Sequence, residues 1–230
     1  MKFTAFLIVV FALATFCFAD TTIVQRIQSG PMMGQPATDT TQTMKIKGMK
    51  ARIDMGNSHN YQILDLNAKK MYMVDPDKKQ ATVMSVDMLN AAGAMFKQAN
   101  KGAEVKVDNL GTTRTVNGFK CTDYQISLTG AMGMQSKQCV TTDVDYKDFE
   151  AFRPYAEGML KSFMGEDTMA KLPKGLAAAS ETTISLMGQN HTAKTELQKV
   201  TKEELPAALF EVPADFKTVE APMGMPQQHP

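Results

Sequence analysis

TTQTMKIKGMKARIDMGNSHNYQILDLNAKKMYMVDPDKKQATVMSV, residues 40–86, is the stretch that decides the fold. In its first segment Gln42, Met44 and Ile46 alternate with polar residues, the period-two pattern of a half-buried strand. Similar segments follow at about ten-residue spacing, separated by short polar breaks. Parallel pairing would require crossovers of a dozen residues or more, so the stretch predicts a meander of antiparallel strands.

Further strands are expected on both sides of this meander. Residues 20–30 (DTTIVQRIQSG) read as a first strand that ends at Gly30-Pro31, and residues 31–37 read as a loop. After Lys174, the segments AASETTISLMG and TAKTELQKV read as strands again. Thr201 and Glu204 match a capping box, which predicts a very short helix within residues 202–210.

Two amphipathic helices are expected to interrupt the strands. The first runs from Val86 to Asn100, and the second from about Tyr146 to Met164, with Pro154 inside it as a kink or an alternative start. Each has one apolar and one polar side, which suits a helix that lies over a sheet. The candidate ligand-pocket residues come from their apolar stripes: Leu89, Phe96, Phe149, Phe152, Met159 and Phe163.

The first residues read as an export signal. Lys2 precedes an apolar run from Phe3 to Phe18, and small residues at 17 and 19 predict cleavage after Ala19. A membrane anchor is the alternative, but the run is short for a span of about 20 residues. We therefore expect a signal peptide (1–19), a single domain (20–220) and a disordered tail (221–230), in a periplasmic or secreted protein.

The balance of charge excludes one class of partner. The chain has 25 Lys and Arg against 24 Asp and Glu, and its formal net charge is +1. Nucleic-acid binding needs clustered basic residues, and a stacking platform needs more aromatic rings than a chain with 7% aromatics and no Trp offers. No nucleic acid is expected as a partner.

Two cysteines remain after the expected cleavage, Cys121 and Cys139. An even pair in an exported chain favours a disulfide. A hairpin folded about residue 130 would place Cys121 opposite Cys139 and Asp123 opposite Lys137, so two chemical pairs favour the same register. A redox or metal-binding pair is the alternative, but there is no C-x-x-C motif and no nearby His.

No catalytic arrangement is visible in the sequence. His59, His191 and His229 stand in polar loops or the tail, and neither H-E-x-x-H nor G-x-S-x-G occurs. The carboxylates are scattered. We expect a protein that is not an enzyme and that needs no cofactor.

Methionine is abundant, with 19 residues in the chain. Thioethers are soft ligands that suit Cu(I), and Met223, Met225 and His229 could form such a site in the tail. The methionines within expected strands and helices are better explained as filling for irregular apolar space, or as the lining of an apolar pocket.

Four segments together resemble a large uncharacterised bacterial periplasmic family whose general shape is that of the lipoprotein carriers LolA and LolB. The segments are KGMKARIDMG (47–56), NYQILDLNAKKMYMVDPDKKQATVM (60–84), GTTRTVNGFKCTDYQISL (111–128) and LPAALFEVPADFK (205–217). The resemblance runs from about Thr22 to Val219, and Cys139 departs from it where a Trp is expected. It implies a strongly curved antiparallel sheet, a half-barrel with helices over its open side, and in the carriers this hollow holds lipoprotein acyl chains.

The fold class expected is therefore mainly β (α+β), with the two helices covering the open side of the half-barrel. The leading functional hypothesis is a periplasmic, non-enzymatic protein that binds a lipid acyl chain or another apolar ligand. The alternatives are a methionine-rich copper-binding protein and an interaction or structural protein of the cell envelope.

Overall fold

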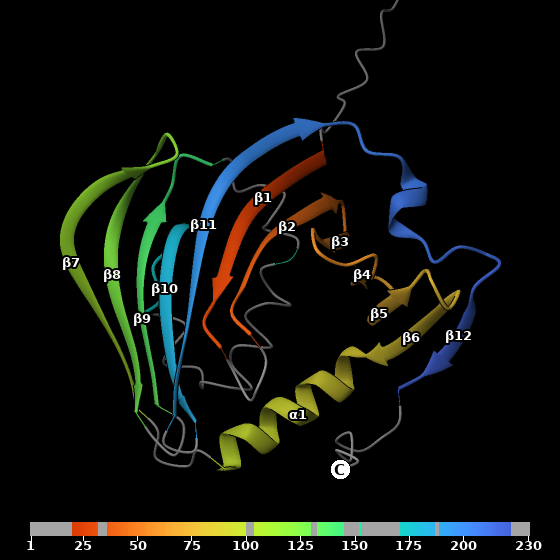
Figure 1. Cartoon of the computed structure of the whole chain (residues 1–230), viewed down its shortest axis with the longest axis horizontal. Coiled ribbons are helices and arrows are strands. Elements are labelled where there is room, and N and C mark those ends of the chain that lie inside the picture. Colours follow the sequence, from red (N-terminus) through yellow and green to blue (C-terminus); the bar gives the residue numbers. More distant parts are fainter. Residues whose placement is uncertain are drawn as a thin grey trace, which may run out of the picture.

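A single large curved sheet dominates the computed structural model (Figure 1). The structure describes residues 20–31, 36–99, 104–129, 133–144, 152, 171–186 and 189–221. The strands are β1 (Asp20–Ser29), β2 (Thr38–Lys47), β3 (Lys50–Met55), β4 (Tyr61–Asp65), β5 (Lys70–Asp75), β6 (Gln80–Ser85), β7 (Glu104–Val116), β8 (Phe119–Thr129), β9 (Gly133–Thr141), β10 (Leu176–Leu186), β11 (Gln189–Glu203) and β12 (Lys217–Glu220). The helical elements are α1 (Val86–Ala99) and the 3-10 turn η1 (Ala207–Phe210).

The strand order of this sheet is β12-β6-β5-β4-β3-β2-β1-β11-β10-β9-β8-β7. Neighbours from β1 to β6 are consecutive in sequence and pair antiparallel, so the predicted meander is confirmed. The sheet differs from the expected antiparallel sheet at its edge, where β12 runs parallel to β6. The long segment between β11 and β12 allows this pair, since it returns the chain to the same end of the sheet.

Helix α1 confirms the first expected helix. It follows β6 directly and, in the view of Figure 1, runs beneath the opening of the curved sheet. The second expected helix, from Tyr146 to Met164, lies outside the described residues except for Phe152. Phe152 packs against a core cluster of the sheet whose buried members are Ile23, Ile46, Ala51, Val144 and Leu197. Of the two helices expected over the sheet, the described residues thus contain one.

The capping box predicted at Thr201 and Glu204 is wrong. Strand β11 continues to Glu203, and Thr201 pairs with Thr22 in β1. The helical turn begins later, after Pro206, and no side chain caps it. Long-range pairing with β1 therefore overrides the local helix-start pattern.

The predicted disulfide between Cys121 and Cys139 is present, with 5.3 Å between the two Cα atoms. The predicted register is wrong by two residues, because Asp123 lies opposite Cys139. The disulfide and the ion pair of Asp123 with Lys137 (3.9 Å) therefore join diagonal neighbours. Both expected partnerships survive because side chains alternate with a period of two, so a shift of two residues keeps every side chain on its face.

The C-terminal segment before β12 is fastened to one face of the sheet. Val212 and Phe216 pack against a buried cluster in β4–β6 that comprises Tyr61, Ile63, Val74 and Ala81. The buried carboxylate of Asp20 accepts a hydrogen bond from the backbone N–H of Leu205 (2.8 Å) and one from Lys47 Nζ (2.7 Å). The first strand and the last segment of the fold are thereby joined.

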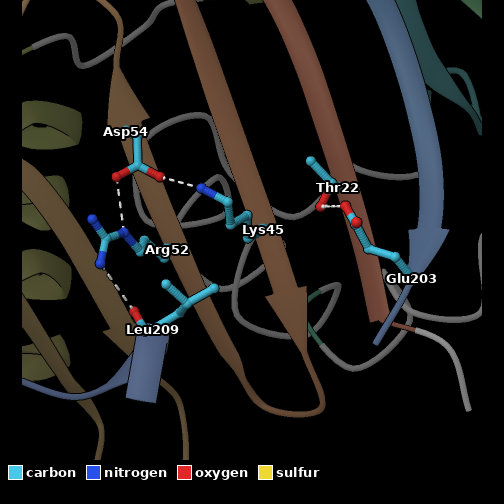
Figure 2. Close-up of polar contacts among 6 residues, drawn as sticks. All are labelled: Thr22, Lys45, Arg52, Asp54, Glu203 and Leu209. Carbon is cyan, nitrogen blue, oxygen red and sulfur yellow. Dashed lines mark hydrogen bonds and ion pairs between the residues drawn. The ribbon is translucent and has the colours of Figure 1, made fainter. Parts of the chain in front are cut away.

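Arg52 provides a second attachment (Figure 2). Its Nε donates to Asp54 (2.8 Å), which also accepts from Lys45 Nζ (2.7 Å), and its Nη1 donates to the carbonyl of Leu209 in η1 (3.4 Å). The guanidinium also lies 3.6 Å from the ring centroid of Tyr61, close enough for a cation–π contact. One planar cation thus connects two strands and the C-terminal turn.

Removing the disulfide is expected to lower stability. The double variant Cys121→Ser, Cys139→Ser should lose roughly 3 kcal/mol of unfolding free energy, because the 18-residue separation no longer restricts the unfolded chain. Urea unfolding monitored by circular dichroism measures the difference. A loss below about 1 kcal/mol would mean that the bridge adds little to this hairpin.

Arg52→Met keeps the aliphatic stem of the side chain but removes its hydrogen bonds and the cation–π contact. We expect a loss of about 1–2 kcal/mol in unfolding free energy, together with faster amide exchange in residues 205–216. The matched control is Arg26→Met, which breaks the ion pair with Asp39 between two side chains that are each nearly half exposed. That exposed pair should matter little. Equal losses for the two variants would contradict the bridging role of Arg52.

Candidate functional site

The register of β2–β6 gathers methionines on one face of the sheet. Residues paired across a ladder share a face, so two rungs can be traced across the five strands. One rung is Met44, Ile53, Gln62, Met73 and Thr82, and the next is Ile46, Ala51, Leu64, Met71 and Met84. Met55 lies opposite Gln42 on the same side. We call this side of β2–β6 the methionine face.

The opposite side of the same strands is the charged face. It carries Lys45, Arg52 and Asp54, and the C-terminal segment covers its apolar part. The two faces thus differ in both chemistry and cover. The contacts of Arg52 with Asp54 and Leu209 in Figure 2 belong to the attachment of the C-terminal segment, so we assign them a structural role.

Burial on the methionine face decreases from the centre of the sheet towards β5. Met44 and Leu64 pack against the core cluster that contains Ile23 and Leu197. Met55, Met71 and Met84 are half-buried. Met73 is 40% exposed. The apolar core therefore continues into an apolar surface.

A cleft of about 420 Å³ lies where this surface meets the loops at one end of β2–β6. Volumes of this size fall within the range of small-molecule sites. From the methionine face its lining includes Gln42, Ile53, Met55, Gln62, Met73 and Thr82. From the adjoining strand ends and loops it includes Ser58, Asn60, Asp75, Lys78 and Gln80. The strand ends and loops thus form a polar rim beside a floor in which Ile53, Met55 and Met73 lie among Gln42, Gln62 and Thr82.

Uncharged amides dominate the polar part of the cleft. Gln42 Nε2 donates to Met55 Sδ (3.6 Å). The side-chain amides of Gln62 and Asn60 are exposed and have no hydrogen-bond partner among the residues that the structure describes. Each amide can donate and accept, so these two amides, one on the floor and one in the rim, can bind the polar group of a ligand.

The charged residues of the rim are already paired. Asp75 and Lys78 are the charged members of the described lining, and Lys78 Nζ lies 2.6 Å from Asp75 Oδ2. The hydrogen bond from Lys78 lowers the pKa of Asp75, and the same bond raises the pKa of Lys78. Both groups are therefore ionised at neutral pH and largely cancel each other's charge.

Of the pocket residues predicted from the helices, Leu89 and Phe152 are not among the residues that line this cleft in the described part of the chain. Leu89 is half-buried in α1, and Phe96 belongs to the same helix. Phe152 packs against the core cluster of the sheet. Phe149, Met159 and Phe163 lie outside the described residues, so their pocket role stays a prediction.

The weak metal candidates Met223, Met225 and His229 also lie outside the described residues. Within those residues, no group of three or more His, Cys, Asp or Glu side chains is arranged to hold a metal ion. His59 contacts Asp77 (3.2 Å), and His191 Nδ1 lies 3.3 Å from the carbonyl oxygen of Pro31, both at exposed positions. No helix in the described part of the chain has both the length and the apolar character needed to cross a bilayer.

Sequence reasoning could have located the cleft. The alternation that placed Gln42, Met44 and Ile46 on one side also places Ile53 and Met55 on one side of the next strand. Pairing consecutive strands through their short turns brings these two sets onto the same face. The signal for the cleft thus lies in the meander and not in the helices.

Three solved structures with a similar outline are distant from this chain in sequence. PNGF-II has 12% identity and a TM-score of 0.43, with 88% of this chain and 32% of that chain covered. The LolA superfamily protein NE2245 from Nitrosomonas europaea has 8% identity and a TM-score of 0.35, with 85% and 91% covered. MucB has 8% identity and a TM-score of 0.38, with 87% and 60% covered. The chain spans about a third of the length of PNGF-II.

Likenesses this distant carry no functional information, so the function has to be inferred from the chain's own side chains. A search of curated proteins finds no match. A family model does match, over residues 32–216, and it confirms the resemblance to an uncharacterised family. This protein belongs to that family, described as a domain of unknown function (DUF4412).

Proposed function

We propose that this protein is an exported, non-enzymatic binding protein that holds an apolar ligand, such as a lipid acyl chain, in the cleft on the methionine face. The observation that carries the proposal is an apolar sheet surface that ends in a cleft of about 420 Å³ with Met73 40% exposed inside it. Exposed apolar surface beside a cleft is a common mark of a ligand site.

Methionine suits the floor of such a site. Its side chain is unbranched and polarisable, so it adapts to ligands of variable shape. Met55 and Met73 lie in the lining together with Ile53. A floor of this kind would accept an alkyl chain without selecting one particular length.

Export is supported by the signal sequence predicted at residues 1–19 and by the disulfide between Cys121 and Cys139. A disulfide suits an oxidising compartment such as the periplasm.

A binding role fits the chemistry of the cleft better than catalysis. Its described lining contains amides, hydroxyls and thioethers, together with one closed pair of charges, Asp75 and Lys78. A general acid–base site would need a titratable group free to exchange a proton with the ligand.

The proposal predicts that a charge placed in the cleft will weaken binding of an uncharged apolar probe. N-phenyl-1-naphthylamine, followed by its fluorescence, should bind the wild-type protein, and Met73→Asp should weaken that binding by roughly tenfold or more. The matched control is Met49→Asp, since Met49 is 36% exposed but is not part of the cleft lining.

The two positions have similar exposure, so both variants should fold, which their melting temperatures check. Absence of probe binding by the wild-type protein would overturn the proposed function. If the two variants weaken probe binding equally, the probe binds somewhere other than the cleft.

A further inference from the structure

We infer that the ligand of this cleft is an uncharged amphiphile, whose apolar chain lies on the methionine face and whose hydrogen-bonding, uncharged head meets the amide rim. The inference rests on the proposed function and narrows it to a class of ligand. It depends on the combination of apolar side chains and amides in the lining and on the pairing of the nearby charges.

The lining brings apolar side chains and amides side by side. Ile53 and Met55 of β3 and Met73 of β5 supply the apolar side chains, and Gln62 of β4 lies between Ile53 and Met73. Asn60 and Gln80 stand where β4 begins and where β6 begins, next to the loops. A ligand that covers both kinds of side chain needs an apolar part and a polar part.

The rim does not offer a cation for an anionic head. Lys78 is the basic residue of the described lining, and it is held by Asp75 at 2.6 Å. An anion that approached Lys78 would also approach the carboxylate of Asp75, which would repel it. The gain from one charge is thus offset by the other.

The neighbouring charges in the same loops are paired too. Lys79 Nζ lies 2.8 Å from Asp215 Oδ2. His59 Nδ1 lies 3.2 Å from Asp77 Oδ1. Arg52, the nearest guanidinium in β3, belongs to the charged face and is bonded to Asp54. An anionic head would therefore lose hydration without gaining a partner.

Amides favour a neutral head for a second reason. The carboxamides of Gln62 and Asn60 each present both donors and an acceptor. Hydroxyl and amide groups on a ligand can use both kinds, whereas a carboxylate can use the donors alone and leaves the amide oxygens unpaired. These amides thus match glycerol-like or amide heads better than acids.

The test compares two ligands that share one alkyl chain. Monolaurin carries an uncharged glycerol head, and laurate carries a carboxylate. Both are used below their critical micelle concentrations, at a pH where laurate is ionised, and their displacement of N-phenyl-1-naphthylamine from the full mature chain is measured. Monolaurin should displace the probe at roughly tenfold lower concentration than laurate.

A charge-releasing variant makes the test specific to this rim. Asp75→Asn frees Lys78 while its side-chain oxygen can still accept the turn hydrogen bond from the Lys78 backbone N–H. It should strengthen laurate binding by roughly tenfold more than it changes monolaurin binding, because only laurate carries a charge for the released Lys78. Asp77→Asn is the matched control, because Asp77 is a carboxylate of the same turn that is not part of the lining, and it should change neither ligand.

The outcomes separate this inference from the proposed function. The inference of an uncharged ligand is wrong if laurate binds as tightly as monolaurin. It is also wrong if neither compound displaces a bound probe. In both cases the proposed apolar site remains. No change in laurate binding on Asp75→Asn also counts against the role given to the Asp75–Lys78 pair. A wild-type protein that does not bind the probe removes both proposals.

Discussion

The antiparallel register of β2–β6 is the constraint on which the rest of this structure depends. Successive side chains in each strand point to opposite faces, and residues paired across a ladder share a face. Met44 therefore lies opposite Ile53 on one face, and Lys45 lies opposite Arg52 on the other. A slip of one residue in any ladder would place methionines among the charges and charges against the core. The two faces acquire separate tasks from this single register. One receives the C-terminal segment, and the other stays partly open as the wall of a cleft.

The C-terminal segment shows why only one face is covered from within the described chain. Val212 and Phe216 bury the small apolar cluster of β4–β6, while Arg52 satisfies the carbonyl of Leu209. The charged face is therefore both packed and hydrogen-bonded. On the methionine face, burial is strong beside β1 and weak at Met73. Because of this gradient, apolar surface stays exposed to water, which is unfavourable in free energy. A ligand that covered this surface would remove the unfavourable contact.

Much of the fold could be predicted from the sequence, because the patterns were local and repeated. Strict alternation and short polar breaks predicted the meander, and the spacing of apolar residues predicted α1. The cysteine hairpin could be predicted only to within two residues, because its turn chemistry is ambiguous. By contrast, Asn117 and Gly118 both have positive φ and form the kind of two-residue turn that an Asn-Gly pair favours, a sign that could have fixed the β7–β8 register. The parallel β12–β6 pair and the loss of the capping box arise from long-range pairing, which local patterns do not contain.

The cleft was less predictable than the fold because its residues have no unusual chemistry individually. Gln62 and Thr82 are ordinary residues of exposed strands, and they become a site only when the ladders align them with Met73. The apolar stripes of the two expected helices, by contrast, are visible within single segments of the sequence. A sheet assembles its surface across strands, so a side chain's neighbours come from positions ten or more residues away. A candidate site on a sheet therefore becomes visible only when residues are followed from one strand to the next across the ladders. In this sheet the ladders bring uncharged amides and thioethers together. The charged residues lie on the other face or form ion pairs, as Asp75 and Lys78 do.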